Sequence, residues 1–433
     1  MLKRPILLCI PRLLPPPRLH NALCRILSPS CKSPHSRRHF STAEVKHTPL
    51  RPFLIERYDG WFDGSESLSS SECESISMRE LLSHADPEAL DRWENLSLAY
   101  PDPSEGDYRL REAIASRHYY DSVNPRSHIN VCAPQEGIFL ALSSLLQPGD
   151  HVVVTTPCYQ SLTEVARSLG CTVSGWRPEG LEAGATPRFE PATLERLLQP
   201  NTKLVVANWP HNPTGALPTA GEFERVLDAC DARGCHLFVD EMYRHLEHAG
   251  DGARLPPACV AYDRGVSLSG LSKTHGLPGL RIGWVCARDE ALMRRVAQLK
   301  DYTTIVPAAP SQALAIVALT TGFEPLLARS RAIVARELEA LRSFVRAHAD
   351  VGLEWCEPSA GTFAFVRLKG LGPGGASAYA DALRARKRLM LIPSALFEEA
   401  ADDRVRLTYG LEGTAAKLER WGEDLRMYGT SGS

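Results

Sequence analysis

Between Asn95 and Ala287 short apolar runs alternate regularly with longer helical patterns, and this alternation constrains the fold more than any other feature. Such alternation is typical of an α/β sheet. Several of the runs are apolar on both faces, as expected of strands that helices cover on both sides of a mainly parallel sheet. Seven runs fit strands: Ile129–Ala133, His151–Thr156, Thr172–Trp176, Lys203–Asn208, His236–Asp240, Gly265–Ser269 and Arg281–Ala287.

Helical patterns fill most of the gaps between these strands. One covers Gln135–Leu146 and stops before Pro148-Gly149, and another covers Tyr159–Leu169 and stops at Gly170. Proline and glycine at these places are ordinary helix stops. The sequence therefore predicts an α/β fold with a mixed, mainly parallel seven-stranded sheet.

Beyond about residue 305 the pattern changes to that of a smaller α+β domain. It consists of a long helical pattern over Pro310–Ala349, strands at Gly361–Leu368, Met390–Pro393 and Val405–Tyr409, and a last helix over Thr414–Tyr428. We expect four parts along the chain: a targeting presequence (1–40), an N-terminal arm that joins the small domain (41–95), a large domain (96–305) and a small C-terminal domain (306–428).

The composition excludes several classes of protein. A formal net charge of −2 implies no general attraction to nucleic acid or to a membrane surface. No apolar run reaches the roughly 18–20 residues of a membrane span. The 12 cysteines are scattered and contain no C-x-x-C pair. We therefore expect reduced thiols, with neither a disulfide framework nor a metal site.

The first 40 residues differ from the rest, because they carry eight Lys or Arg and no Asp or Glu. The string Arg38-His39-Phe40-Ser41 is similar to a mitochondrial processing site. We expect this segment to be a removable presequence and the protein to be mitochondrial, in the matrix. The alternative is a disordered basic tail on a cytoplasmic protein, and the prolines of Pro5–Pro17 disfavour a transit helix.

The strongest chemical signal is the string from Ser272 to Gly283, which begins Ser272-Lys273-Thr274-His275-Gly276. A lysine in a loop is usually a solvated charge. Lys273, however, follows an apolar strand and precedes a turn rich in Gly and Pro. Such surroundings desolvate the amine, lower its pKa and make it a nucleophile that can form an imine with an aldehyde. Arg281, eight residues on, can hold a phosphate or form a structural ion pair.

Two further signals lie at the carboxyl ends of predicted strands, where open α/β sheets bind ligands. The string Asn208-Trp209-Pro210-His211-Asn212-Pro213-Thr214-Gly215 follows one strand, and Asp240-Glu241-Met242-Tyr243 ends another. A buried Asp is costly without a cation beside it. A pyridinium nitrogen would supply that cation, and the carboxylate would keep the nitrogen protonated.

Taken together, in this order and spacing, the three strings resemble those of the class I/II aminotransferases, the fold-type-I enzymes that use pyridoxal 5′-phosphate (PLP). The resemblance runs from about Arg51 to the C-terminus. Within the family it is greatest to the branch that includes capreomycidine synthase. The shared features are Glu56-Arg57-Tyr58, the Ser69-Ser70-Ser71 run before Glu80-Leu81, Pro210-His211-Asn212-Pro213-Thr214-Gly215 and Leu277-Pro278-Gly279-Leu280-Arg281.

The resemblance implies a role in cofactor binding for several residues. Lys273 would form the Schiff base with PLP and shuttle a proton, and Asp240 would bond the ring nitrogen. Tyr243 and Asn212 would bond the 3′-oxygen of the cofactor. Tyr159 would stack on the ring, although a lone Tyr is more often a core residue.

Other residues would hold the phosphate. Arg281 would be one ligand, and the turn Ala133-Pro134-Gln135 would offer the start of a helix to it. Because Pro134 has no N–H, Gln135 and the residues after it must be the donors. The family usually has Ser or Thr three residues before the lysine, where this chain has Gly270. Ser269 or Ser272 would then supply the hydroxyl.

Substrate binding is implied for Arg406, Tyr100 and Asn212. Arg406 would take the substrate α-carboxylate, unless it is a charge on a strand edge. Tyr100 resembles a tyrosine that reaches the phosphate of the partner subunit, so a homodimer with shared active sites is expected. The side-chain pocket is expected around Ser71–Ser75, Tyr100 and the loop Asp301-Tyr302-Thr303-Thr304, where Glu72, Glu74 and Asp301 are acidic.

The resemblance implies a PLP-dependent aminotransferase that moves an amino group between an L-amino acid and a 2-oxo acid through the Lys273 Schiff base. The alternative within the family is an eliminating or cyclising enzyme similar to capreomycidine synthase, acting on a modified basic amino acid. Because one fold hosts many reactions, the fold alone does not decide between them. A binding module without cofactor is a third hypothesis, against which Lys273, Asp240 and Arg281 argue.

Overall fold

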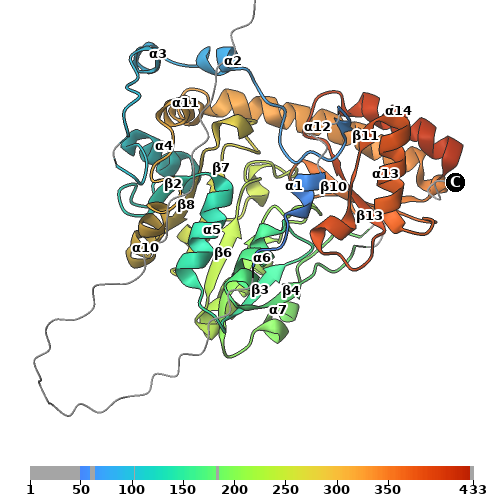
Figure 1. The fold of residues 1–433 in the computed structure, drawn as a ribbon, viewed down its shortest axis with the longest axis horizontal. Coiled ribbons are helices and arrows are strands. Elements are labelled where there is room, and N and C mark those ends of the chain that lie inside the picture. Colours follow the sequence, from blue (N-terminus) through green and yellow to red (C-terminus); the bar gives the residue numbers. More distant parts are fainter. Residues whose placement is uncertain (1–48, 59–63, 102, 182–184, 430–433) are drawn as a thin grey trace, which may run out of the picture. The chain divides into compact units, whose positions relative to one another are not determined.

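A computed structural model describes residues 49–58, 64–101, 103–181 and 185–429. The predicted presequence, with its processing string at Arg38–Ser41, lies outside the described residues. Figure 1 labels the helices and strands along the chain.

The larger sheet has seven strands in the order β2-β8-β7-β6-β5-β3-β4. Strands β3 to β7 pair in parallel, whereas β8 runs antiparallel to both β7 and β2. This confirms the predicted mixed, mainly parallel sheet, with strand ends within two residues of the predicted ones. The strands are β2 (Ile129–Cys132), β3 (His151–Thr155), β4 (Thr172–Trp176), β5 (Thr202–Asn208), β6 (His236–Asp240), β7 (Gly265–Gly270) and β8 (Gly283–Ala287).

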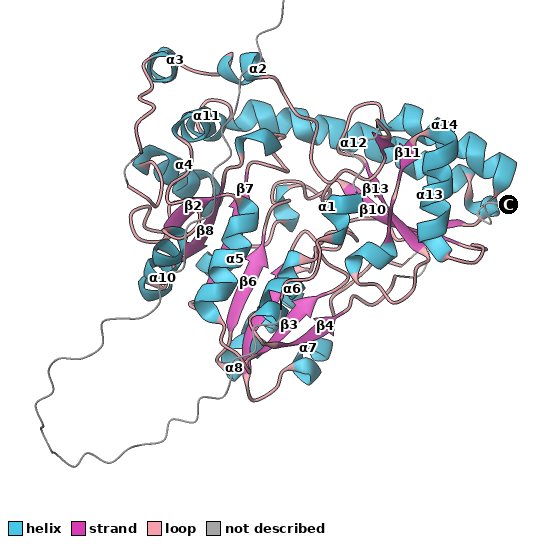
Figure 2. Cartoon of the chain, viewed as in Figure 1, coloured by secondary structure: helices cyan, strands magenta, loops and turns pink. Residues whose placement is uncertain are grey.

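Successive side chains of the central strands enter two separate cores, because side chains alternate across a strand. On one face Val206 and Phe238 pack beneath α5 (Pro134–Leu145), α6 (Ser161–Ser168) and α10 (Glu290–Lys300). On the other face Val205 and Leu237 pack against α7 (Pro191–Leu197), α8 (Ala220–Arg233) and α9 (Ala258–Ala261). Helices on both sides explain why the centres of β5 and β6 are apolar on both faces (Figure 2).

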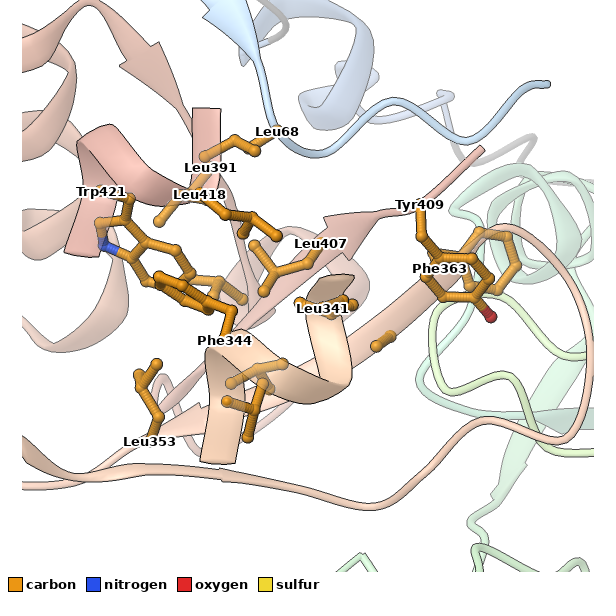
Figure 3. Packing of buried hydrophobic residues seen from close by; sticks show 14 of the residues in the cluster. Leu68, Leu341, Phe344, Leu353, Phe363, Leu391, Leu407, Tyr409, Leu418 and Trp421 are labelled. Carbon is orange, nitrogen blue, oxygen red and sulfur yellow. The ribbon is translucent and has the colours of Figure 1, made fainter. Parts of the chain in front are cut away.

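A four-stranded antiparallel sheet lies in the C-terminal part, in the order β12-β13-β10-β9. Leu407 of this sheet packs against Leu341 and Phe344 of one helix and Leu418 and Trp421 of another, as Figure 3 shows. The strands are β9 (Leu353–Trp355), β10 (Phe363–Leu368), β12 (Ile392–Pro393) and β13 (Arg404–Thr408), and the helices are α12 (Phe323–Ala347), α13 (Gly375–Lys387) and α14 (Thr414–Tyr428).

The N-terminal arm joins this smaller sheet region. Strand β1 (Glu66–Ser67) pairs in parallel with β11 (Leu389–Met390). Three short helices also belong to the N-terminal part, namely α1 (Leu54–Tyr58), α2 (Met78–Leu82) and α3 (Pro87–Glu94), and α4 (Tyr108–Tyr119) follows them. Short 3₁₀ helices cover Asp251–Ala253, Pro278–Leu280, Ala349–Val351 and Ser394–Phe397.

The prediction of one long helix over Pro310–Ala349 is wrong. The chain forms α11 (Ala309–Leu319) and α12, bent by 78° at a break. The break contains Thr320, Thr321 and Gly322, which are poor helix formers. Among the described residues no single helix is long and apolar enough to cross a membrane, and only this bent pair meets that test of length and composition. The run Met390–Pro393 divides between β11 and β12, and the sequence did not predict β1, β9 or α13.

Candidate active site

The carboxyl ends of β5 and β6 lie side by side, because Asn208 and Asp240 are register partners at the last position of each strand. The side chain of Asn208 links them further by donating from Nδ2 to the carbonyl of Asp240 at 2.9 Å. Its Oδ1 accepts from the backbone N–H of Asn212 at 2.7 Å, which ties down the turn after β5. This edge of the sheet is where open α/β sheets bind ligands.

Asp240 is only 7% exposed, and its Oδ1 accepts a hydrogen bond from the backbone N–H of Met242 at 3.1 Å. Burial raises the pKa of Asp240 to about 7, and the positive charge of Lys273 only partly offsets this. A carboxyl group in such a place is stabilised by a cation delivered to it. The protonated ring nitrogen of a bound pyridine fits this requirement.

Lys273 projects from the loop after β7 toward the N-terminal arm. Its Nζ donates to Ser71 Oγ at 2.7 Å and lies 3.8 Å from Glu72 Oε2. Desolvation lowers the pKa of Lys273, and the nearby Glu72 opposes this shift. The loop itself is held by the hydroxyl of Thr274, which donates to the carbonyls of Met242 and Arg244 at 3.1 and 2.9 Å. A desolvated amine on a fixed loop is a suitable nucleophile for an aldehyde.

Arg406 lies on β13 and is only 3% exposed. Its Nε and Nη2 donate to the carbonyl of Ser69 at 2.9 and 2.6 Å, and its Nη1 donates to Asn212 Oδ1 at 3.1 Å. These bonds fix the plane of the guanidinium group. The structure therefore brings together Arg406 and Asn212, the two residues that the sequence assigned to substrate binding. The positive charge of Arg406 also contributes to the lowered pKa of Lys273, after the larger effect of desolvation.

Two tyrosines line the same region. Tyr243 is buried and meets the ring of Phe363 edge-on at 4.7 Å between centroids. Burial raises the pKa of Tyr243, and a hydrogen bond with Ser71 opposes this. The hydroxyl of Tyr159 donates to Glu56 Oε1 at 2.9 Å. Burial also raises the pKa of Tyr159, so both phenols stay protonated at neutral pH.

Two parts of the structure fit a phosphate group. Pro134 and Gln135 form the first turn of α5, whose free N–H groups attract anions. The hydroxyl of Ser272 is buried and has no hydrogen-bond partner among the described residues. A buried polar group without a partner is costly, and a phosphate oxygen would satisfy it.

Packing explains the unusual Gly270. A Cβ built at Gly270 would lie 2.9 Å from both Gly283 Cα and Ile282 O, and 3.2 Å from Pro134 Cγ. A serine does not fit between β7, β8 and the start of α5 at these distances. The hydroxyl at Ser272 is thus the better placed of the two that the sequence suggested, since Ser269 Oγ contacts the carbonyl of Glu241 at 3.4 Å.

Other predicted site residues do not join this cluster within one chain. Arg281 is exposed and donates to the carbonyl of Pro278, in its own turn, at 3.4 Å. Tyr100 is 85% exposed. Thr303 and Thr304 of the predicted pocket loop bond the carboxylate of Glu136 instead.

Sequence reasoning assigned no role to Ser69 or to the Asn208 side chain. No local pattern points to Ser69, because its contact with Arg406 spans 337 residues. Asn208 was visible only as the first residue of the string that runs from Asn208 to Gly215. Its position at a strand end was the one signal that could have identified it.

A lysine, a buried aspartate and a phosphate cradle at the strand ends of such a sheet define a PLP-dependent enzyme of fold type I. The family model described as aminotransferase class I and II matches residues 85–424. The chain belongs to this family. PLP is accordingly its cofactor.

Individual relatives agree with this assignment. The chain is 32% identical over 394 residues to capreomycidine synthase of Streptomyces vinaceus, covering 86% of this chain and 91% of that protein. Its fold is similar to a PLP-dependent aminotransferase from Streptococcus suis, with a TM-score of 0.77, 27% identity and coverage of 88% and 99% of the two chains. It is equally similar to the PLP-dependent cyclase OrfR, with a TM-score of 0.78, 26% identity and coverage of 89% and 100%.

Proposed function

We propose that this protein is an aminotransferase that moves an amino group between an L-amino acid and a 2-oxo acid. The observation that carries the proposal is the guanidinium of Arg406, which Ser69 and Asn212 fix in one orientation. Lys273 lies in the same site, because its amine donates to Ser71, two residues along the chain from Ser69. A planar guanidinium can take a carboxylate with two parallel hydrogen bonds. It would thereby place the α-carbon of an amino acid beside the amine.

The residues of the strand ends would hold the cofactor. Asp240 would pair with the ring nitrogen, Asn212 and Tyr243 would bond the 3′-oxygen, and Ser272 with the start of α5 would bind the phosphate. When bound, PLP supplies an aldehyde that condenses with amines and a ring that withdraws electrons from the α-carbon. Lys273, with its lowered pKa, would accept the α-proton and return it.

A second function is favoured by a specific observation. Capreomycidine synthase and the cyclase OrfR are among the similar proteins, and they cover 86% and 89% of this chain. The alternative is therefore an elimination or cyclisation on a modified basic amino acid at the same site. The two reactions differ in whether a 2-oxo acid is consumed.

The test uses purified holoenzyme and a panel of L-amino acids. Aminotransfer predicts that an amino acid alone converts the cofactor to its amine form, and that a 2-oxo acid then restores the original visible band. Elimination or cyclisation predicts product without any oxo acid and a cofactor that keeps its aldehyde. Absence of the amine form with every donor would contradict the aminotransferase proposal.

The exposure of Tyr100 supports a homodimer. Tyr100 is 85% exposed on the single chain, which is unusual for a large aromatic ring. In a dimer the partner would cover it, and it would reach the phosphate of the neighbouring site. Light scattering measures the mass of the particle, and Tyr100→Ala is expected to weaken both assembly and cofactor binding.

A further inference from the structure

The N-terminal arm passes through the active site as an extended segment, from Ser69 to Glu74, which we call the arm segment. The backbone N–H of Cys73 donates to the carbonyl of Lys273 at 3.2 Å, and that of Glu74 donates to the carbonyl of Gly410 at 2.8 Å. The hydroxyl of Thr362 donates to the carbonyl of Ser71 at 2.9 Å. The arm segment is therefore fixed between the lysine loop and the smaller sheet.

Two glycines allow this close approach. A Cβ at Gly276 would lie 2.5 Å from the carbonyl oxygen of Glu74, and a Cβ at Gly410 would lie 2.5 Å from that of Glu72. Neither position has room for a side chain while the arm segment keeps its path. The position of Glu72 is thus set by backbone packing on both sides.

Glu72 faces the reacting amine. Its Oε2 lies 3.8 Å from Lys273 Nζ and accepts from the backbone N–H of Ser71 at 3.1 Å. The side chain of Glu72 is 22% exposed, so water screens its charge only in part. Glu56 adds a second negative charge that acts on Lys273.

Covalent engagement of Lys273 changes this balance. In the form of the enzyme that a substrate meets first, Lys273 would be condensed with the cofactor aldehyde. An imine nitrogen is less basic than an amine, so Glu72 would then face a weaker cation than the ammonium group. Asp240 would receive the cofactor ring nitrogen, and Arg406 would receive the substrate carboxylate. The α-amino group of an arriving substrate would face the aldehyde carbon of the cofactor. The side chain of the substrate is the remaining source of positive charge.

We infer that Glu72 selects amino acids with a cationic side chain, a guanidinium or an ammonium group. This rests on the proposed function only in taking the active site as an amino-acid site with Arg406 as its carboxylate receptor. A charge-assisted hydrogen bond in a partly buried site contributes about 1.5–3 kcal/mol, or about ten- to a hundredfold in affinity.

The test separates recognition from chemistry by using ligands that cannot react. The probes are 5-guanidinopentanoate and 5-ureidopentanoate, which are arginine and citrulline without the α-amino group. Calorimetry measures their binding to wild-type, Glu72→Gln and Glu74→Gln holoenzyme. Glu74 is the matched control, because it lies on the same arm segment but its carboxylate accepts from the backbone N–H of Glu412 at 3.0 Å.

The guanidinium compound is expected to bind wild-type and Glu74→Gln protein about ten- to a hundredfold more tightly than the urea. In Glu72→Gln this preference is expected to vanish while the urea binds as before. Equal affinities in the wild type, no binding of either compound, or a preference that survives in Glu72→Gln would each overturn the inference. If the preference is present but no amino acid donates its amine, the proposed aminotransfer fails and the selection by Glu72 stands.

Discussion

The active site has two sides that are built in different ways. On the cofactor side, Asp240, Asn212 and Lys273 each follow or end a strand of one sheet. Neighbours in the chain hold Asp240 and Asn212, and the loop of Lys273 is held by the residues that follow the adjacent strand β6. On the substrate side, the arm segment and Arg406 are held by partners far away in the chain. Ser71 and Lys273 are 202 residues apart, and Ser69 and Arg406 are 337 apart.

This difference indicates how such an enzyme can keep one chemistry and change its substrate. The cofactor side depends on strand ends that the core of the large sheet makes rigid. The substrate side depends on the arm segment, which can pass close to the backbone at positions 276 and 410 because both residues are glycine. A change in the arm segment would alter recognition without disturbing the sheet. The predictions that follow test this separation, from the largest expected effect to the smallest.

Replacement of Lys273 by alanine removes the centre of the cofactor side. We expect kcat to fall by at least about 10²–10⁴, the usual contribution of a positioned proton-transfer group. The visible band of the lysine-bound cofactor should also disappear. Lys203→Ala, at an exposed position of β5, is the control and should retain both. Retention of turnover by the Lys273 variant would contradict the assignment of the nucleophile.

Replacement of Asp240 by asparagine should lower the activity of the holoenzyme but raise the stability of the apoprotein. Loss of a buried charge partner costs about 2–5 kcal/mol, so kcat/KM should fall at least about 30-fold. In the apoprotein the effect on stability should be opposite. Because burial raises the folded pKa of Asp240 to about 7, its ionisation opposes folding increasingly as the pH rises from about 4 to 7.

The Asp240→Asn apoprotein should therefore unfold at higher urea concentration than the wild type at pH 8, with a free energy of unfolding that is larger by up to about 4 kcal/mol. The difference should shrink as the pH falls from about 7 to 4 and vanish below pH 4. A variant apoprotein that is less stable than the wild type at pH 8 would show that the carboxylate already has a stabilising partner.

Replacement of Gly276 by alanine should disturb the substrate side. Gly276 has a φ of +65°, and an added Cβ meets the carbonyl of Glu74 at 2.5 Å. We expect a loss of about 1–3 kcal/mol in the free energy of unfolding and weaker binding of amino-acid analogues. Gly279→Ala is the matched control in the same loop, because nothing lies within 4 Å of its added Cβ. Equal effects of the two variants would argue against the close approach of the arm segment.

The smallest effect concerns three buried histidines, His118, His245 and His275, of which His275 lies on the lysine loop itself. The rings of His245 and His275 lie 5.1 and 5.8 Å from that of His118. Burial lowers the pKa of each, to about 4 for His275. Below pH 6.5 the unfolded chain binds protons that the folded protein does not, so stability should fall as the pH falls.

Each of these imidazoles contributes up to about 1.4 kcal/mol per pH unit between about pH 6.5 and its folded pKa. Urea unfolding between pH 7.5 and 5 measures this slope. In His118→Phe the slope should be smaller by about that amount, because the ring at 118 packs among Trp284 and Phe323 and needs no charge. An unchanged slope would mean that His118 is protonated in the folded protein.

The sequence by itself predicted the seven strands and the residues that end or follow them, among them Asn212, Asp240 and Lys273. Strand patterns and turn residues are local signals, and parallel strands bring their carboxyl ends to one edge whatever the rest of the chain does. The bend between α11 and α12 was not predicted, because a short Thr-Thr-Gly break hardly alters a long helical periodicity.

Only the tertiary structure decided the surroundings of Gly270 and Glu72. The family usually has Ser or Thr at the position of Gly270, and the sequence did not explain the difference. The structure explains it, because Gly283 and Pro134 leave no room for a side chain there. Glu72 was one acid among several in a polar stretch until its carboxylate was placed 3.8 Å from Lys273 Nζ. Contacts between residues hundreds of positions apart depend on how sheets and loops pack together, and no local pattern records that packing.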